Sequence, residues 1–159
     1  MTDFPALLGA LAGHEVEFIL VGGVAATAHG SARLTQDLDV VYRRNPANFR
    51  RLTQALAPHS PYLRGAPPGL PFQWDEVTIA HGLNFTLVTA LVSIDLLGEI
   101  VGGGKYELLL PHTIVLRLFG IDCRALDLAK LIEVKRAAGR PKDLEAIAEL
   151  EQLLAERAG

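Results

Sequence analysis

Two aspartates separated by one residue are the most informative chemical feature of this 159-residue chain. Asp37 and Asp39 lie in the stretch Asp-Leu-Asp-Val-Val-Tyr (37–42), whose apolar composition predicts a β-strand. Residues two apart on a strand point to the same side, so both carboxylates are expected on one face while Leu38 faces the core. Neighbouring carboxylates repel unless a cation lies between them, and hard oxygen ligands favour Mg²⁺ or Mn²⁺. The alternative is a pair of solvent-facing aspartates.

A third carboxylate strengthens the interpretation as a metal site. Asp95 lies within Val-Ser-Ile-Asp-Leu-Leu (92–97), where a charge inside an apolar strand is costly unless it is paired or bound. If this strand lies next to the one that carries Asp37 and Asp39, the three carboxylates converge. That geometry holds two divalent ions about 4 Å apart, the arrangement used for phosphoryl and nucleotidyl transfer.

A glycine pair adds an expected phosphate site. The run 16–21, Val-Glu-Phe-Ile-Leu-Val, predicts a strand that ends at Gly22 and Gly23, and a short alanine-rich helix is expected over 24–29. Backbone N–H groups near a helix N-terminus can cradle a phosphate. A magnesium site and a phosphate site on neighbouring loops together predict a site for a nucleoside triphosphate (NTP).

The same residues resemble a known family. Gly22-Gly23 followed by residues 28–39, Ala-His-Gly-Ser-Ala-Arg-Leu-Thr-Gln-Asp-Leu-Asp, resembles the signature of the DNA polymerase β-like nucleotidyltransferase superfamily. The form Arg-x-Thr-x-Asp-Leu-Asp is closest to its small prokaryotic branch, which includes toxin nucleotidyltransferases of the abortive-infection type IV class. A second match, Lys-Arg-Ala-Ala-Gly-Arg-Pro-Lys-Asp-Leu (135–144), is similar to a segment on the C-terminal helices of that branch. With Asp95, the motifs span most of the chain.

The resemblance implies a mixed β-sheet flanked by helices and a role for each matching residue. Asp37 and Asp39 would bind both metals, and Asp95 would be the third carboxylate, which helps to deprotonate an attacking hydroxyl. Many members carry Gly-Ser where this chain has Gly22-Gly23. With a glycine there only backbone donors are expected, and hence a lower triphosphate affinity. The residues expected to contact the nucleotide are Gly22, Gly23, Arg33, Thr35, Lys135 and Arg140.

The C-terminal motif also allows a structural interpretation. Lys135 and Arg140 flank an expected turn between two helices, and Lys142 follows in the first turn of the second helix. For Lys142 and Arg136, solvated charges around a capped turn are as good an account as nucleotide binding. For Lys135 and Arg140 we favour nucleotide binding, because the resemblance puts such groups near the triphosphate. Asp143 is expected either to act as an anion at the helix N-terminus or to orient Arg140 through a bidentate pair.

Apolar periodicity and turn residues predict the remaining elements. Further strands are expected at 85–89, 91–97 and 113–118, and an irregular loop at 58–71, which contains five prolines and two glycines. Helices are expected near Leu7, after Pro46, after Asp127 and after Pro141, the last two as a C-terminal pair. The predicted fold class is α/β or α+β in a single domain over 1–159. Its core is expected at 16–120 and its C-terminal helices at 125–157.

Composition limits the class of protein. With 50% hydrophobic and 21% charged residues the chain has the balance of a globular protein, and a net charge of −3 argues against non-specific coating of nucleic acid. Cys123 is the only cysteine, which excludes an intrachain disulfide and fits a reducing cytosol. The N-terminus lacks a signal-peptide pattern, and no apolar stretch reaches the ~20 residues that span a bilayer. A cytoplasmic protein without membrane contact is expected.

The leading functional hypothesis is an enzyme that transfers a nucleoside monophosphate from an NTP, with Mg²⁺ or Mn²⁺, to a hydroxyl of RNA, a protein or a small molecule. Members of this branch often work in toxin–antitoxin pairs, so the resemblance implies a toxin with an antitoxin partner. An RNA acceptor needs a basic surface, which a group of five arginines would supply. The alternative is that these arginines form a solvated helix face. The alternative function is a non-catalytic module that binds a nucleotide or a partner. The arginines that would form the basic surface are Arg33, Arg43, Arg44, Arg50 and Arg51.

Overall fold

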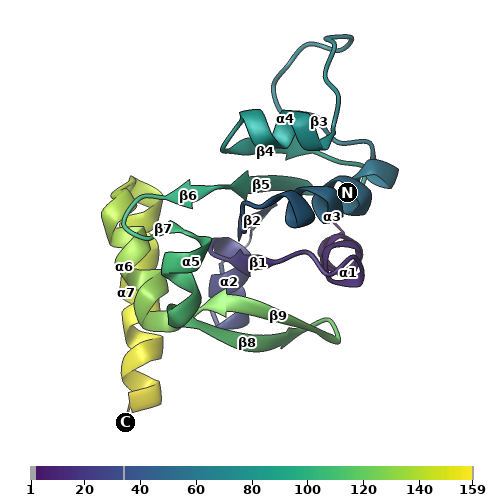
Figure 1. Cartoon of the computed structure of the whole chain (residues 1–159). Helices are drawn as coiled ribbons and strands as arrows, with labels where there is room; N and C mark the ends of the chain where they lie inside the picture. The colour runs from purple at the N-terminus through teal and green to yellow at the C-terminus, as the bar shows by residue number, and fades with distance from the viewer. Residues whose placement is uncertain (1–2, 34, 159) are drawn as a thin grey trace.

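The computed structural model describes residues 3–33 and 35–158. Figure 1 shows a mixed β-sheet with helices packed against it, and this architecture confirms the predicted fold class. In the described ranges, no helix has the length and apolarity needed to cross a bilayer. The helices are α1 (Phe4–Gly13), α2 (Gly23–Ala28), α3 (Pro46–Leu56), α4 (Glu76–His81), α5 (Tyr106–Leu109), α6 (Leu128–Ala138) and α7 (Pro141–Ala158). The strands are β1 (Phe18–Leu20), β2 (Asp37–Tyr42), β3 (Tyr62–Leu63), β4 (Phe85–Val88), β5 (Ser93–Leu97), β6 (Glu99–Ile100), β7 (Gly104–Lys105), β8 (Thr113–Leu118) and β9 (Ile121–Leu126).

The strand carrying the aspartate pair lies at the centre of the sheet. The seven strands have the order β3-β4-β5-β2-β1-β9-β8, and β6 and β7 form a separate pair. Strand β2 runs antiparallel to β1 and parallel to β5. The parallel register aligns Asp39 with Asp95 and Asp37 with Ser93. The two strands expected to carry the carboxylates are therefore neighbours, although more than fifty residues separate them in sequence.

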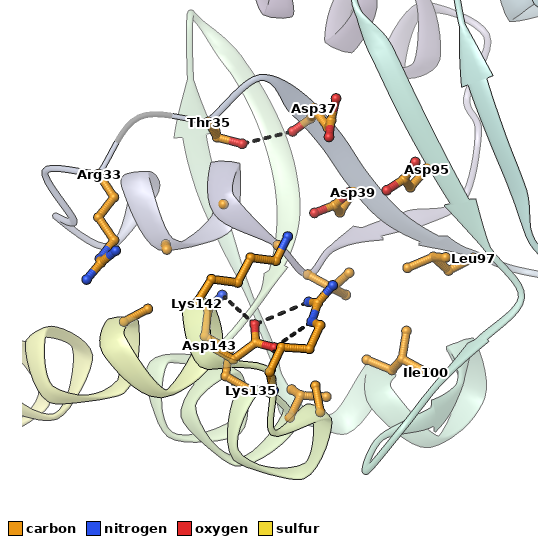
Figure 2. Close-up of a pocket in the computed structure, with 18 of the residues that line it drawn as sticks. Arg33, Thr35, Asp37, Asp39, Asp95, Leu97, Ile100, Lys135, Lys142 and Asp143 are labelled. Carbon is orange, nitrogen blue, oxygen red and sulfur yellow. Dashed lines mark hydrogen bonds and ion pairs between the residues drawn. The ribbon is translucent and has the colours of Figure 1, made fainter. Parts of the chain in front are cut away.

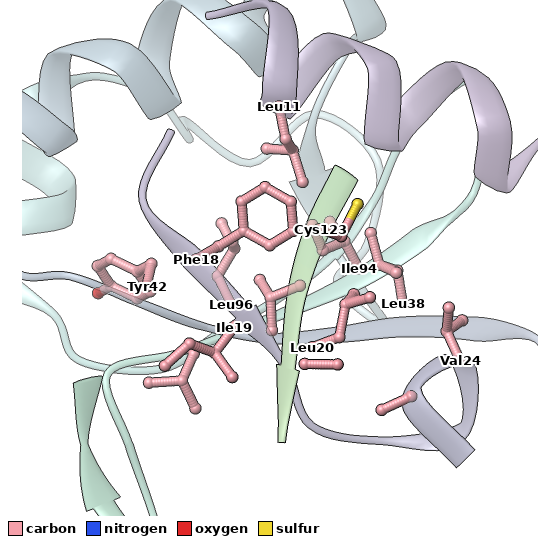
Figure 3. Packing of buried hydrophobic residues seen from close by; sticks show 14 of the residues in the cluster. Leu11, Phe18, Ile19, Leu20, Val24, Leu38, Tyr42, Ile94, Leu96 and Cys123 are labelled. Atoms are coloured by element: carbon pink, nitrogen blue, oxygen red, sulfur yellow. The ribbon is translucent and has the colours of Figure 1, made fainter. Parts of the chain in front are cut away.

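Alternation along β2 separates the core from the aspartates. Leu38 is fully buried, whereas Asp37 and Asp39 lie on the opposite face of the strand and are partly exposed. In Figure 3, Leu38 lies near Ile94 of β5, with Leu11 of α1 above this part of the sheet. The buried apolar residues form one cluster that includes side chains of both α1 and α7. The C-terminal helices therefore share the core with the sheet, which fixes their distance from β2.

Capping residues start the C-terminal helices where the sequence predicts. The Asp127 side chain accepts a hydrogen bond from the backbone N–H of Lys130 at 2.8 Å and caps α6. Gly139, with a φ of 65°, ends α6 in the left-handed conformation, and Pro141 begins α7. This sharp turn packs α6 and α7 against each other and confirms the predicted helical pair.

Some elements differ from the prediction. Strand β9 extends the sheet beyond residue 120, the predicted end of the core, after a two-residue turn in which Phe119 and Gly120 have φ angles of 52° and 77°. Such turns favour Asn-Gly, so Phe-Gly carried little hairpin signal. The proline-rich loop contains β3, which pairs with β4, and α4 and α5 are additional short helices. The other predicted elements are present within a few residues of their expected ends.

Candidate functional site

A cavity of about 690 Å³ lies between the central strands and the two C-terminal helices. One side, which we call the acidic wall, consists of Asp37, Asp39 and Asp95. The other side, the basic wall, surrounds the turn between α6 and α7 and consists of Lys135, Arg140, Lys142 and Asp143. Figure 2 shows the two walls facing each other. The structure thus brings the three predicted carboxylates into one cavity, which Gly22 and Gly23 also line.

Asp39 is the most strongly perturbed group of the acidic wall. Burial raises its pKa first, followed by the adjacent Asp95 carboxylate and the charge of Asp37, and together they bring the pKa of Asp39 to about 7 although Lys142 opposes them. In the described structure, Asp39 Oδ1 is buried without a hydrogen-bond partner. A buried carboxylate oxygen without a partner is costly. The surroundings of Asp39 in the described structure therefore disfavour its ionised form.

The acidic wall matches a divalent cation in chemistry but does not form a closed coordination shell. Three carboxylates supply the hard oxygen ligands that Mg²⁺ and Mn²⁺ prefer, and the unpartnered Asp39 oxygen is available to one. Within residues 3–33 and 35–158, however, no three His, Cys, Asp or Glu side chains gather closely enough to hold a metal ion. Asp37, Asp39 and Asp95 would have to move closer together around an incoming ion.

Arg64 contacts the acidic wall, although no sequence motif predicts it as a site residue. Its Nη2 lies 2.9 Å from Asp95 Oδ1 and 3.8 Å from Asp37 Oδ1. Arg64 directly follows β3, and its backbone N–H donates to the carbonyl oxygen of Thr86, the residue of β4 that pairs with Asp95. The sheet register thus brings the guanidinium to the carboxylates. In the proline-rich segment no motif or spacing marks this arginine, so only the strand topology reveals it.

The glycine pair lets two side chains of the first motif approach the backbone. A Cβ atom at Gly22 would lie 2.0 Å from Asp39 Oδ2, and one at Gly23 would lie 2.6 Å from Thr35 Oγ1. The Thr35 hydroxyl, which donates to the carbonyl oxygen of Asp37 at 3.1 Å, therefore fills the space that a serine side chain at position 23 would need. Residue 35, which is itself among the residues expected to contact the nucleotide, thus places a hydroxyl beside the backbone donors of Gly23.

Asp143 organises the basic wall. Its carboxylate accepts hydrogen bonds from Arg140 Nε at 2.6 Å and from Nη2 at 3.2 Å, which is the bidentate pair considered from the sequence. Lys135 Nζ lies 3.9 Å from Asp143 Oδ1. Although burial favours the neutral acid, these two cations hold the pKa of Asp143 below its usual value. Burial also lowers the pKa of Lys135, which Asp143 opposes. Both predicted cations line the cavity, but each already has an anionic partner.

Lys142 is the cation of the basic wall that extends toward the acidic wall. Figure 2 shows its side chain reaching toward Asp39, and its charge lowers the pKa of that carboxyl. Among the residues that the structure describes, Lys142 has no ion-pair partner within 4 Å. Arg136, by contrast, pairs with Glu151 on α7. The sequence supports nucleotide binding and a solvated charge equally for these two residues, whereas the structure gives them different surroundings.

Arg33 borders the cavity at a distance from the carboxylates. Its Nη1 lies 3.8 Å from Glu145 of α7, and the side chain is about half exposed. The preceding turn is attached to the same helix, because the Ser31 hydroxyl donates to Glu149 at 2.6 Å. Figure 2 shows Arg33 at the opposite end of the view from Asp95. Arg33 therefore lines the cavity on the side away from Asp95.

The arginines considered as a nucleic-acid surface are largely engaged within the protein. Arg43 and Arg51 pair with Glu17 at 2.7 and 3.6 Å, and Arg50 pairs with Glu76 at 3.4 Å. The arginine at position 44 donates to main-chain carbonyl oxygens of α4. These contacts neutralise most of the positive charge and favour the account in which the arginines form a structural, solvated face.

No protein-family model matches this chain, and a search of curated proteins gives no match. The resemblance to nucleotidyltransferases therefore rests on the residues of the two motifs. The cavity itself combines Asp39, whose Oδ1 has no hydrogen-bond partner in the described structure, with Lys142, which has no anionic partner there. A ligand that satisfies both walls is a cation bound to a polyanion.

Proposed function

We propose that the protein is a nucleotidyltransferase that depends on a divalent metal and transfers a nucleoside monophosphate from an NTP to a hydroxyl acceptor. The observation that carries the proposal is the register of β2 and β5, which aligns Asp39 with Asp95 in a cavity that also contains Lys142. A metal-bound triphosphate has the charges that both walls require. Its metal suits the carboxylates, and its phosphate oxygens suit the ammonium group.

Other parts of the cavity support the same substrate class. The Thr35 hydroxyl and the backbone at Gly23 supply polar groups near the aspartates. Leu97, Ile100 and Val134 form an apolar part of the lining, which suits the face of a nucleobase. Figure 2 shows Leu97 and Ile100 on the side of the cavity away from Arg33. A nucleotide has the same division into a charged end and an apolar end.

The proposed step is an in-line displacement at the α-phosphorus. The acceptor oxygen forms a bond to phosphorus, the bond from the α-phosphorus to the bridging oxygen breaks, and pyrophosphate leaves. Asp95 takes the proton of the acceptor hydroxyl, and Lys142 stabilises negative charge on the phosphates. Divalent ions held by Asp37, Asp39 and Asp95 would neutralise phosphate charge. Catalysis by these residues is then mainly positioning and electrostatic stabilisation.

Transfer of radiolabel tests the proposal. The protein is incubated with α-³²P-labelled NTPs, Mg²⁺ and either total RNA or a protein fraction. We expect labelled acceptor with wild type and a loss of about 100-fold or more with Asp39→Asn. The matched control is Asp122→Asn, because Asp122 is an exposed aspartate that pairs with Arg117 and lies outside the cavity lining. Absence of labelling by wild type, or equal labelling by Asp39→Asn, would sink the proposal.

The acceptor and the biological role are proposals from the resemblance. RNA, a protein hydroxyl or a small molecule remain the acceptor classes, and the paired arginines weaken the argument for a broad RNA-binding surface. A toxin with an antitoxin partner would arrest growth when expressed alone. Asp39→Asn should relieve that arrest while the protein stays folded. Growth arrest that is equal for both proteins would argue against an enzymatic toxin.

Arg64 favours a second candidate, a non-catalytic module that binds a nucleotide or a partner. Its guanidinium compensates the charges of Asp95 and Asp37 in the absence of metal, as expected of a site that no longer binds a metal ion. Calorimetry separates the two functions. Nucleotide binding that persists in EDTA, without turnover, identifies the module, whereas binding that requires Mg²⁺ supports the enzyme.

A further inference from the structure

We infer that Arg64 is an internal counter-cation of the acidic wall and that an incoming divalent ion takes its place between Asp37 and Asp95. The inference rests on the proposed function only in taking a divalent cation as the incoming charge. It adds a step to that function, because the site must release one positive charge before it receives another.

The distances make the guanidinium and a metal ion alternatives. Arg64 Nη2 lies within 4 Å of a carboxylate oxygen of both Asp37 and Asp95. A Mg²⁺ ion shared by those carboxylates would lie at about 2.1 Å from its oxygen ligands. The ion and Nη2 would then compete for one space, and their charges have the same sign. Both cannot occupy the position between the two aspartates.

The guanidinium is held mainly by the carboxylate it would give up. Apart from its ion pairs with Asp95 and, at 3.8 Å, with Asp37, Nη2 makes a long hydrogen bond of 3.4 Å to the carbonyl oxygen of Leu87. Within the described residues, Arg64 Nε is buried without a partner. Arg64 is therefore not held by a network that would keep it in place once a stronger cation reaches Asp95. The backbone N–H of Arg64 is hydrogen-bonded to Thr86 of β4. In the exchange we therefore expect the side chain to rotate while the backbone stays in place.

The exchange has a consequence for what the site accepts. A free divalent ion must displace Arg64 and lose that interaction, so the free ion binds weakly. A metal that arrives with a triphosphate brings phosphate oxygens that interact with Lys142 and the rest of the basic wall. Arg64 thus favours the metal–nucleotide complex over the free metal. Removing its charge should make the free ion a better ligand.

Titration with Mn²⁺, followed by the electron paramagnetic resonance signal of the free ion, tests the inference without nucleotide. We expect Arg64→Gln to bind Mn²⁺ about tenfold more tightly than wild type, because a positive charge close to the ligands is removed. Arg64→Lys keeps a positive charge and should bind like wild type, which excludes a general effect of substitution. Arg50→Gln is the matched control, since Arg50 pairs with Glu76 on the surface. The melting temperature in EDTA shows that each variant is folded.

Equal or weaker Mn²⁺ binding by Arg64→Gln would overturn the inference, and so would a lack of Mn²⁺ binding by all four proteins. The proposed function is judged separately, by label transfer from an NTP. If Arg64→Gln binds Mn²⁺ more tightly and neither protein transfers label, the exchange stands and the proposed function fails. If wild type transfers label and Arg64→Gln binds Mn²⁺ like wild type, the function stands and the exchange fails.

Discussion

The two walls of the cavity carry opposite charges and satisfy them differently. In the basic wall, Asp143 pairs with Arg140 and lies near Lys135, and its pKa is held below the usual value. In the acidic wall, Asp39 has a buried oxygen without a partner in the described structure and a pKa raised to about 7. The charges of the basic wall are largely paired within the fold, whereas those of the acidic wall are paired only in part.

This difference separates charges that are paired within the fold from charges that we propose interact with a ligand. The second motif, at residues 135–144, contains both kinds: Arg140 and Asp143 secure the turn between α6 and α7, while Lys142 extends across the cavity toward Asp39. The acidic wall is also mixed, because Arg64 compensates Asp95 and Asp37 but is not paired with Asp39. We therefore expect substitutions in the two walls to affect different properties of the protein.

The largest expected effect distinguishes Asp39 from Asp143. Asp39→Asn should reduce label transfer about 100-fold or more in a folded protein, because it removes a ligand group. Asp143→Asn should instead lower the free energy of unfolding by about 2 kcal/mol, because the pair with Arg140 and the contact with Lys135 are weakened. Label transfer and urea denaturation measure the two effects. The distinction between the two walls is contradicted if Asp143→Asn leaves the free energy of unfolding unchanged and removes label transfer as completely as Asp39→Asn.

A second effect concerns the pH dependence of stability in EDTA. The pKa of Asp39 is about 7 in the folded protein and 3.8 in its ordinary state, so between these values the folded state holds a proton that the unfolded state releases. Raising the pH through this window therefore destabilises the wild type. Asp39→Asn lacks this titrating proton. The difference in free energy of unfolding between Asp39→Asn and wild type should therefore be about 3 kcal/mol more favourable to the variant at pH 7.5 than at pH 4.5. Urea denaturation at both pH values measures the gain, and parallel pH profiles for the two proteins would contradict it.

A third prediction concerns the packing behind the acidic wall. Gly23→Ser places its new atoms against Thr35, so it should destabilise the protein by about 1–3 kcal/mol. Thr35→Ala makes room, and the double variant should recover part of that loss. A double-mutant cycle by thermal unfolding measures the coupling. Additive effects of the two substitutions would show that the close approach of residues 23 and 35 does not affect the free energy of unfolding.

The smallest expected effect is on nucleotide affinity. Lys142→Gln should weaken binding of Mg²⁺–NTP about five- to tenfold, because a cation without a protein partner is lost from the phosphate end of the cavity. Arg136→Gln is the control, since Arg136 pairs with Glu151. Calorimetry on both variants sharpens the division within the second motif. Equal affinities for Lys142→Gln and Arg136→Gln would place Lys142 with the structural charges.

Local pattern was enough to predict the parts of the site that lie within single elements. Period-two alternation put Leu38 in the core and the aspartates on the other face, and the turn before Pro141 followed from glycine and proline preferences. The adjacency of β2 and β5 was a conditional expectation, because no local pattern states which strands pair. Only the structure shows that β2 and β5 pair, in the register that aligns Asp39 with Asp95.

Long-range contacts account for what the sequence did not reveal. Arg64 reaches Asp95 only because β3 pairs with β4 and β4 with β5. Thr35 fills the space beside Gly23 through the path of the chain before β2, which no spacing rule describes. The different environments of Lys142 and Arg136 depend on how α6 and α7 pack. Charge and spacing identified these residues as candidates, and only tertiary structure distinguishes their contacts.

The most direct test of the central claim compares two positions of the label in the same nucleotide. Wild type and Asp39→Asn are incubated with Mg²⁺, the acceptor fraction and an NTP labelled either at the α- or at the γ-phosphate. The account predicts that wild type attaches the α-label to the acceptor, releases the γ-label as pyrophosphate, and that Asp39→Asn does neither. Attachment of the γ-label, or attachment of the α-label by Asp39→Asn at the rate of wild type, would contradict it.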